Sequence, residues 1–192
     1  MELDKYIKVY DNALGVHQIS SIIKWSKNLN FYDGGVTEKS IINKEIRNVS
    51  IYDLHALQNC SHTRVHWRNF LSALITKIIK EDYEKDLCKI PQTSGFTGVG
   101  ELSLLKYEVG GHYDLHCDAF TEAPRILSCI LLLNDDYKGG ELQFADPITK
   151  EVYKTVENKS GKLIIWPSNF MFPHGIKPII KGQRYSIVGW TY

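Results

Sequence analysis

The second half of the chain is a run of short strand patterns, and this feature most limits what the chain can fold into. Between residues 101 and 192, stretches rich in β-branched, leucine and aromatic residues alternate with turns that contain Gly, Pro, Asn or Asp. We predict strands at 101–107, 112–117, 126–133, 141–144, 151–155, 163–166, 174–179 and 184–191. Short strands in this number fit a jelly roll of two sheets, so the fold class is predicted to be mainly β.

The first half of the chain predicts two amphipathic helices. In residues 11–29, apolar side chains recur at three- and four-residue steps, the period of a helix that lies on another layer. A second helix is predicted over residues 64–79, with Ser61 or Thr63 as its N-cap. Strand 126–133 is nearly continuously apolar, as expected of a strand covered on both faces. We therefore expect both N-terminal helices to pack on one sheet of the jelly roll.

Length and charge restrict the class of protein further. The chain has 192 residues, the size of one ordinary domain. We predict a single domain, in which residues 1–100 provide helical support and edge strands and residues 101–192 form the jelly-roll core with the functional site. The net charge of +1 offers no basic surface for nucleic acid. No signal-peptide pattern or membrane-length apolar run occurs, so we expect a cytoplasmic protein without a membrane partner.

Three residues of the strand-rich half predict a metal site. Side chains two positions apart on a strand share a face, so His116 and Asp118 can direct a nitrogen and an oxygen to one point. His174, near the C-terminus, is the best candidate for a third ligand. Two histidines and one carboxylate on one face suit redox-active Fe(II), whereas zinc more often takes thiolates or a third histidine.

A second histidine and acid pair competes with the first. His112 and Asp114 have the same spacing as His116 and Asp118. On a regular strand all four side chains would point to the same face, because successive side chains alternate. The spacing alone therefore leaves open which pair binds the metal.

Five segments, in order and without large gaps, resemble the 2-oxoglutarate and Fe(II)-dependent dioxygenases, in particular their prolyl 4-hydroxylase-like branch. They are Tyr107-x-x-Gly110-x-x-Tyr113-x-x-His116-x-Asp118, Arg125 leading to Asn134, Gly139-Gly140-Glu141-Leu142-x-Phe144, Phe172-Pro173-His174-x-x-x-Pro178 and Gly182-x-Arg184-Tyr185-Ser186-x-x-x-Trp190. The resemblance covers roughly residues 101–192 and selects His116 over His112. It implies a double-stranded β-helix (jelly roll) with N-terminal helices packed on it.

The resemblance also implies an activity and its cofactors. Fe(II) held by His116, Asp118 and His174, with O2 and 2-oxoglutarate, would hydroxylate a substrate and release succinate and CO2, with ascorbate as a supporting reductant. Prolyl residues of a peptide or protein are the first expectation for the substrate. A small molecule or another side chain is an alternative substrate. A metal-stabilised binding module without turnover, or Zn(II)-assisted hydrolysis, is an alternative function.

The distal carboxylate of 2-oxoglutarate needs its own site. Arg184 fits this task, because a guanidinium binds a carboxylate with two parallel hydrogen bonds, and Ser186 on the same strand face can donate a third. Tyr107 is a further candidate donor. We predict that residues 180–182 form a three-residue hairpin loop that pairs the strand of His174 with that of Arg184 and puts both on one face.

Four residues are expected to line the substrate side of the site: Tyr113, Arg125, Leu142 and Trp190. Leu132 marks a departure from the family pattern. It stands in Leu131-Leu132-Leu133-Asn134, where some prolyl hydroxylases have Tyr-Tyr-Leu-Asn. A tyrosine that would help to bind 2-oxoglutarate is therefore missing, so either Tyr107 or another donor replaces it or the affinity for 2-oxoglutarate is reduced.

Overall fold

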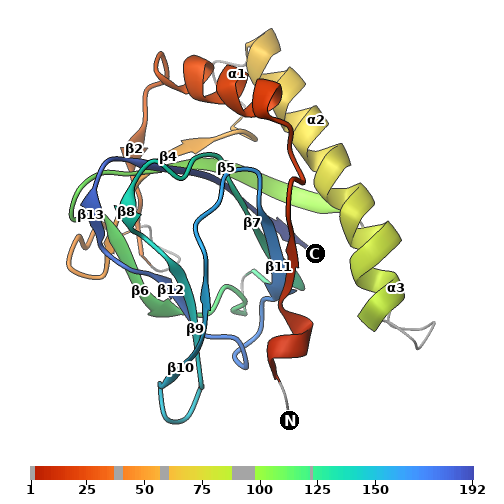
Figure 1. Ribbon diagram of the computed structural model, residues 1–192, viewed down its shortest axis with the longest axis vertical. Helices are drawn as coiled ribbons and strands as arrows, with labels where there is room; N and C mark the ends of the chain where they lie inside the picture. Colours follow the sequence, from red (N-terminus) through yellow and green to blue (C-terminus); the bar gives the residue numbers. More distant parts are fainter. Residues whose placement is uncertain (1–2, 37–40, 57–60, 88–97, 122) are drawn as a thin grey trace.

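The computed structural model describes residues 3–36, 41–56, 61–87, 98–121 and 123–192. Its strands form two facing antiparallel sheets that enclose an interior, with the helices outside (Figure 1). This is the predicted jelly roll with N-terminal helices. None of the helices in these ranges is both long and apolar enough to cross a membrane.

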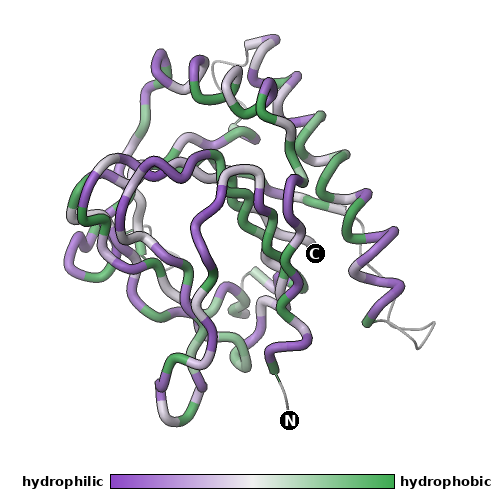
Figure 2. The backbone as a smooth tube through the Cα atoms, in the orientation of Figure 1, coloured by the Kyte–Doolittle hydropathy of each residue, from purple (hydrophilic) through white to green (hydrophobic). Residues whose placement is uncertain are grey.

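The larger sheet has seven strands in the order β1-β11-β7-β14-β5-β4-β2. Their bounds, in chain order, are β1 Lys8–Tyr10, β2 Tyr32–Asp33, β4 Ser50–Asp53, β5 Val99–Tyr107, β7 Leu127–Leu132, β11 Leu163–Pro167 and β14 Arg184–Thr191. Every residue of β7 is buried, and the strand is coloured mostly green in Figure 2. The prediction that this strand is covered on both faces is thus confirmed.

The smaller sheet has five strands in the order β10-β9-β12-β6-β3. Their bounds are β3 Arg47–Asn48, β6 His112–His116, β9 Leu142–Ala145, β10 Val152–Val156 and β12 His174–Ile176. Two further short strands, β8 Lys138–Gly139 and β13 Ile179–Lys181, pair with each other.

Two helices cover the outer face of the larger sheet. They are α1, Val16–Ser26, and α2, His62–Ile78, which continues through a π-helical turn at Ile79–Tyr83 into α3, Glu84–Leu87 (Figure 1). The backbone N–H of Arg64 donates to the Ser61 hydroxyl over 3.2 Å, so Ser61 is the N-cap of α2. The buried side chains that join the helices to the sheet include Ile19, Ile22, Leu71, Ile75, Leu102, Leu104 and Leu131.

A second core fills the space between the sheets. Alternation along each strand divides the larger sheet between the two cores, so Leu104 packs under the helices and Leu105 packs inside. The inner core includes Tyr107, Ile130, Leu132, Leu142, Phe144, Trp166, Ile176 and Val188. Polar side chains within this apolar space need partners, so they indicate where a ligand binds.

The predicted hairpin around residues 180–182 is wrong. The predicted strand 174–179 is broken at Lys177 and Pro178, because proline has no N–H for a sheet hydrogen bond. Its first part, β12, pairs with β6 and β9 in the smaller sheet, and β13 pairs with β8. Strand β14 pairs with β5 and β7 in the larger sheet. His174 and Arg184 therefore belong to opposite sheets.

Candidate functional site

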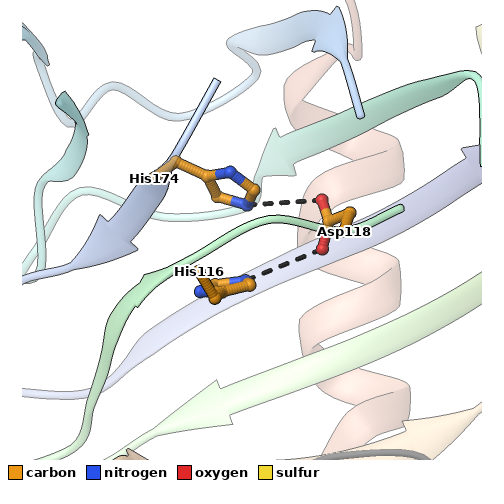
Figure 3. A group of neighbouring side chains, drawn as sticks. All are labelled: His116, Asp118 and His174. Atoms are coloured by element: carbon orange, nitrogen blue, oxygen red, sulfur yellow. Dashed lines mark ion pairs between the residues drawn. The ribbon is translucent and has the colours of Figure 1, made fainter. Parts of the chain in front are cut away.

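His116, Asp118 and His174 meet at one end of the space between the sheets. His116 ends β6 and His174 begins β12, and the two residues are direct cross-strand partners. Asp118 follows β6 by two residues and points between the two rings (Figure 3). Its carboxylate oxygens lie 3.6 Å from Nε2 of His116 and 3.3 Å from Nε2 of His174. All three ligand atoms lie within 4.8 Å of one another, close enough for one metal ion to contact them all.

A β-bulge in β6 decides between the two histidine and acid pairs. His174 pairs with His116, but Ile176, two residues further on, pairs with Tyr113, three residues back. The extra residue reverses the side-chain alternation, so Tyr113 and His116 both line the interior. His112 instead contacts the carbonyl oxygens of Gly110 and Glu45, and Asp114 is exposed. The rival pair therefore lies outside the site.

Backbone contacts fix the tautomers of both histidines. Nδ1 of His116 lies 2.8 Å from the carbonyl oxygen of Asp114, and Nδ1 of His174 lies 3.0 Å from that of Phe172. A carbonyl oxygen only accepts hydrogen bonds, so Nδ1 must carry the proton in each ring. The lone pair of each neutral ring is then on Nε2, which faces Asp118. Burial, and then the charge of His174, lower the pKa of His116, which favours this neutral form.

Asp118 is ionised in this environment. Burial acts to raise its pKa, but the positive charge of His174 and the hydrogen bonds that both histidines donate when their Nε2 atoms are protonated, as they can be without a metal, outweigh burial and hold the pKa well below its usual range. The Ser128 hydroxyl donates to the carboxylate over 2.6 Å and lies 2.8 Å from the Ser168 hydroxyl. Two imidazoles whose Nε2 atoms face one oriented carboxylate are a donor set that fits Fe(II).

A cavity of about 120 Å³ opens beside these three residues. It is lined by Arg47, Leu105, Tyr107, Tyr113, His116, Asp118, Arg125, Ile130, Trp166, His174, Ile176, Val188 and Trp190. An outer groove of about 700 Å³ shares Arg47, Tyr113 and Arg125 with it and leads towards β2. Of the residues expected on the substrate side, Tyr113, Arg125 and Trp190 line the cavity.

Leu142 does not line this cavity. It is 1% exposed, pairs with Ile176 across β9 and β12, and packs in the inner core. The expectation that Leu142 contacts substrate is not supported by its position, because neighbouring inner-core side chains cover it.

Arg184 is a fully buried cation with unused donors. Its side chain is 0% exposed, and one terminal nitrogen donates to the Ser186 hydroxyl over 2.8 Å. Its Nε and second terminal nitrogen have no hydrogen-bond partner among the described residues. Its guanidinium carbon lies 5.2 Å from the ring centroid of Tyr107, which also lines the cavity. A buried guanidinium without a carboxylate partner fits an anionic ligand such as the distal carboxylate of 2-oxoglutarate.

Two arginines stack on aromatic rings of the cavity. The guanidinium carbon of Arg125 lies 3.8 Å from the Trp190 ring centroid, and that of Arg47 lies 4.5 Å from the Tyr113 ring centroid. Both Nε atoms are buried and have no partner within the described part of the chain. Arg47 was not among the residues expected from the sequence. It comes from β3, and no motif or spacing connects that strand to Tyr113.

This combination defines a class of protein. A jelly roll with two histidines and a carboxylate at the mouth of its interior, and positions left open for other ligands, is characteristic of non-haem iron oxygenases. Comparisons with known proteins agree. Residues 102–192 match the family model described as the 2OG-Fe(II) oxygenase superfamily.

Relatives and solved structures extend this match. A segment of 66 residues is 36% identical to human prolyl 3-hydroxylase 2, and it covers 34% of this chain and 9% of that protein. A prolyl hydroxylase from Trichoplax adhaerens, solved with a hypoxia inducible factor peptide fragment, superposes with a TM-score of 0.78 at 18% identity over 97% of this chain and 83% of the other. A Pseudomonas putida prolyl-4-hydroxylase gives a TM-score of 0.73 at 19% identity over 97% and 92%.

Residues 102–192 thus match the 2OG-Fe(II) oxygenase superfamily, and the fold of the chain is that of the prolyl hydroxylases. The predicted double-stranded β-helix and the resemblance stated from the sequence are thus confirmed. The superfamily is named for Fe(II) and 2-oxoglutarate, which it uses with O2. The chain spans only a small part of the length of the curated prolyl 3-hydroxylases it matches.

Proposed function

We propose that the protein is an Fe(II)- and 2-oxoglutarate-dependent dioxygenase that hydroxylates prolyl residues of a peptide or protein and releases succinate and CO2. The observation that carries this proposal is the pair of complementary sites in one interior. One site has two histidine Nε2 atoms and an ionised carboxylate, and the other has a buried guanidinium with unused donors. A binding module without turnover has no need of the second site.

His116, Asp118 and His174 would hold the metal. The two histidines present fixed Nε2 lone pairs, and Asp118 contributes the negative charge that a divalent cation needs. Ser128 orients the carboxylate from behind. When bound, iron together with 2-oxoglutarate supplies the oxidising chemistry, and the surrounding residues orient the reactants and exclude water.

Arg184 and Ser186 would hold the co-substrate. The two unused nitrogens of Arg184 can donate in parallel to the distal carboxylate of 2-oxoglutarate. This end of the molecule would then be fixed in the inner core, and its keto acid end would lie towards the three metal-binding residues. Tyr107 borders both regions, since it lines the cavity and its ring faces Arg184.

The outer groove supports a peptide as substrate. Its walls combine aromatic rings such as Tyr32, Tyr113 and Phe120 with the guanidinium groups of Arg47 and Arg125. Rings can pack against prolyl side chains, and the unused arginine donors can bind the carbonyl oxygens of an extended chain. Similarity to prolyl hydroxylases, one of them solved with a peptide, supports the same choice.

Peptide hydroxylation can be measured directly by mass spectrometry. Proline-rich peptides are incubated with the protein, Fe(II), 2-oxoglutarate and ascorbate in air, and the control peptides have alanine in place of each proline. We expect a mass increase of one oxygen atom only in proline-containing peptides and only with native His174, and amino-acid analysis then identifies 3- or 4-hydroxyproline. Turnover of 2-oxoglutarate that no peptide stimulates would instead favour a small-molecule substrate.

A further inference from the structure

Arg184 and Ser186 do not by themselves complete a carboxylate site. A carboxylate has two oxygens with about four acceptor positions. Ser186 lies directly opposite Leu132 on the neighbouring strand, and Leu132 has no polar group to add. Another donor is therefore needed near Arg184 if a buried carboxylate is to be fully satisfied.

Tyr137 brings a hydroxyl to this region. The residue is 8% exposed, and its hydroxyl is buried with no hydrogen-bond partner among the residues that the structure describes. Burial raises its pKa, while the charge of Arg184 and the approach of the hydroxyl to the guanidinium oppose the rise, so the hydroxyl stays protonated beside Arg184. A buried hydroxyl without a partner costs free energy and indicates that a bound group supplies the acceptor.

Gly140 lets Tyr137 and Arg184 approach each other. A Cβ atom added to Gly140 would lie 3.1 Å from Cδ of Arg184 and 3.3 Å from Cε2 of Tyr137. Gly140 has a φ of +70°, which also favours glycine at this position. The stem of Arg184 and the ring of Tyr137 thus pack against the same small residue.

Asn134 fixes the segment that carries Tyr137. Its side chain donates to the carbonyl oxygen of Gln183 over 2.7 Å and accepts from the N–H of Tyr185 over 2.7 Å. These bonds tie the loop after β7 to the start of β14, on both sides of Arg184. The position of Tyr137 relative to Arg184 is therefore set by the fold before any ligand binds.

We propose that the Tyr137 hydroxyl donates a hydrogen bond to the distal carboxylate of 2-oxoglutarate, beside Arg184 and Ser186. The inference rests on the proposed function, since it names a residue that positions the co-substrate. Tyr137 thereby takes the place of the donor that Leu132 cannot supply, from the loop that follows β7 rather than from the strand itself.

The test compares two ligands that differ only at the distal end. 2-Oxopentanoate has a methyl group where 2-oxoglutarate has its distal carboxylate. Both are titrated calorimetrically, without O2, into Fe(II)-loaded native protein, Tyr137→Phe and Tyr185→Phe. Tyr185 is the matched control, because its hydroxyl is bound to the Gln183 side chain outside the buried region.

We expect Tyr137→Phe to weaken 2-oxoglutarate binding by about tenfold to a hundredfold, the usual effect of losing a hydrogen bond to a charged group. Its affinity for 2-oxopentanoate should match that of the native protein, and Tyr185→Phe should bind both ligands normally. Equal 2-oxoglutarate affinity in Tyr137→Phe and native protein would overturn the role of Tyr137 and leave the proposed function intact. Equal weakening for both ligands would also overturn it, since that result indicates a general disturbance. If native Fe(II)-loaded protein binds no 2-oxoglutarate, both proposals fail.

Discussion

His116 and His174 lie directly opposite each other on paired strands, with their ring centroids 4.4 Å apart. Because β6 and β12 are neighbours in the smaller sheet, the ladder itself sets the spacing of the two imidazoles. Arg184 lies on β14 in the larger sheet. The two sheets thus contribute different parts of the proposed site: one carries the histidines proposed to hold the metal, and the other carries the arginine proposed to bind the carboxylate.

Removing the Arg184 guanidinium should weaken co-substrate binding and leave metal binding unchanged. We expect Arg184→Ala to lose about 3 to 5 kcal/mol of 2-oxoglutarate binding free energy, the cost of breaking a buried charge pair. Calorimetry with 2-oxoglutarate and with Fe(II), each in the absence of O2, measures the two affinities separately. Unchanged 2-oxoglutarate affinity in this variant would exclude the assigned role.

Arg47 should affect the peptide and not the co-substrate. Its guanidinium stacks on Tyr113 and donates to the carbonyl oxygen of Gly35 over 2.7 Å, at the boundary between cavity and groove. We expect Arg47→Gln to raise the KM for a peptide substrate about tenfold, as for a lost charged hydrogen bond, with the KM for 2-oxoglutarate unchanged. The control is Arg68→Gln on α2, where the side chain bonds its neighbour Asn69. Parallel changes in both KM values would contradict the prediction.

The His112 side chain should stabilise the fold more at acidic than at alkaline pH. Its two ring nitrogens each lie 3.0 Å from a carbonyl oxygen, of Gly110 and of Glu45, and only the doubly protonated ring can donate to both. The hydrogen bond to Glu45, and then that to Gly110, raise its pKa.

The sign of the effect follows from this shift. Because the pKa of His112 is higher in the folded than in the unfolded state, the stabilisation that its hydrogen bonds give is fully present below the unfolded-state pKa of about 6.5. This stabilisation is lost as the pH rises through the folded-state pKa. The difference in Tm between native protein and His112→Gln should therefore be larger at about pH 5.5 than at about pH 9. Scanning calorimetry of the metal-free proteins measures it, and a difference that grows with pH would refute the assigned contacts.

The helical layer should contribute to stability without acting in the site. Leu71 on α2 is 0% exposed and packs against the outer face of the larger sheet. Leu71→Ala should lower the free energy of unfolding by about 2 to 5 kcal/mol, from lost burial and the cavity left behind. Lys77→Ala on the exposed side of the same helix should change it by less than about 0.5 kcal/mol. Urea unfolding curves compare the two, and similar losses would show that α2 is not packed through Leu71.

Periodicity predicted the main elements because local patterns determine them. The apolar stripe of α1 and the continuous apolar run of β7 each require burial on known faces, and the structure has them there. The order of His116, Asp118 and His174 in the sequence likewise predicted a cluster that the structure brings together. These features depend on neighbouring residues or on a motif that can be recognised in the chain.

Long-range pairing could not be predicted in the same way. The bulge in β6 that separates His116 from His112 depends on its partner β12, and the sheet to which β12 belongs depends on the whole topology. The predicted local hairpin would pair the strand of His174 with that of Arg184, whereas the structure places these strands in different sheets. The sequence did not indicate a role for Tyr137 or Arg47 for the same reason. Only the folded chain brings Tyr137 beside Arg184 and Arg47 beside Tyr113.

Succinate formation from 2-oxoglutarate tests the central claim, that His116, Asp118 and His174 together hold the iron. Native protein and the variants His116→Ala, Asp118→Ala, His174→Ala and His112→Ala are assayed in air with Fe(II), ascorbate and peptide. We predict that each of the first three variants abolishes both Fe(II) binding and succinate formation, and that His112→Ala keeps both. Succinate formation that persists without His174, or that fails without His112 in a folded variant that still binds Fe(II), would contradict this account.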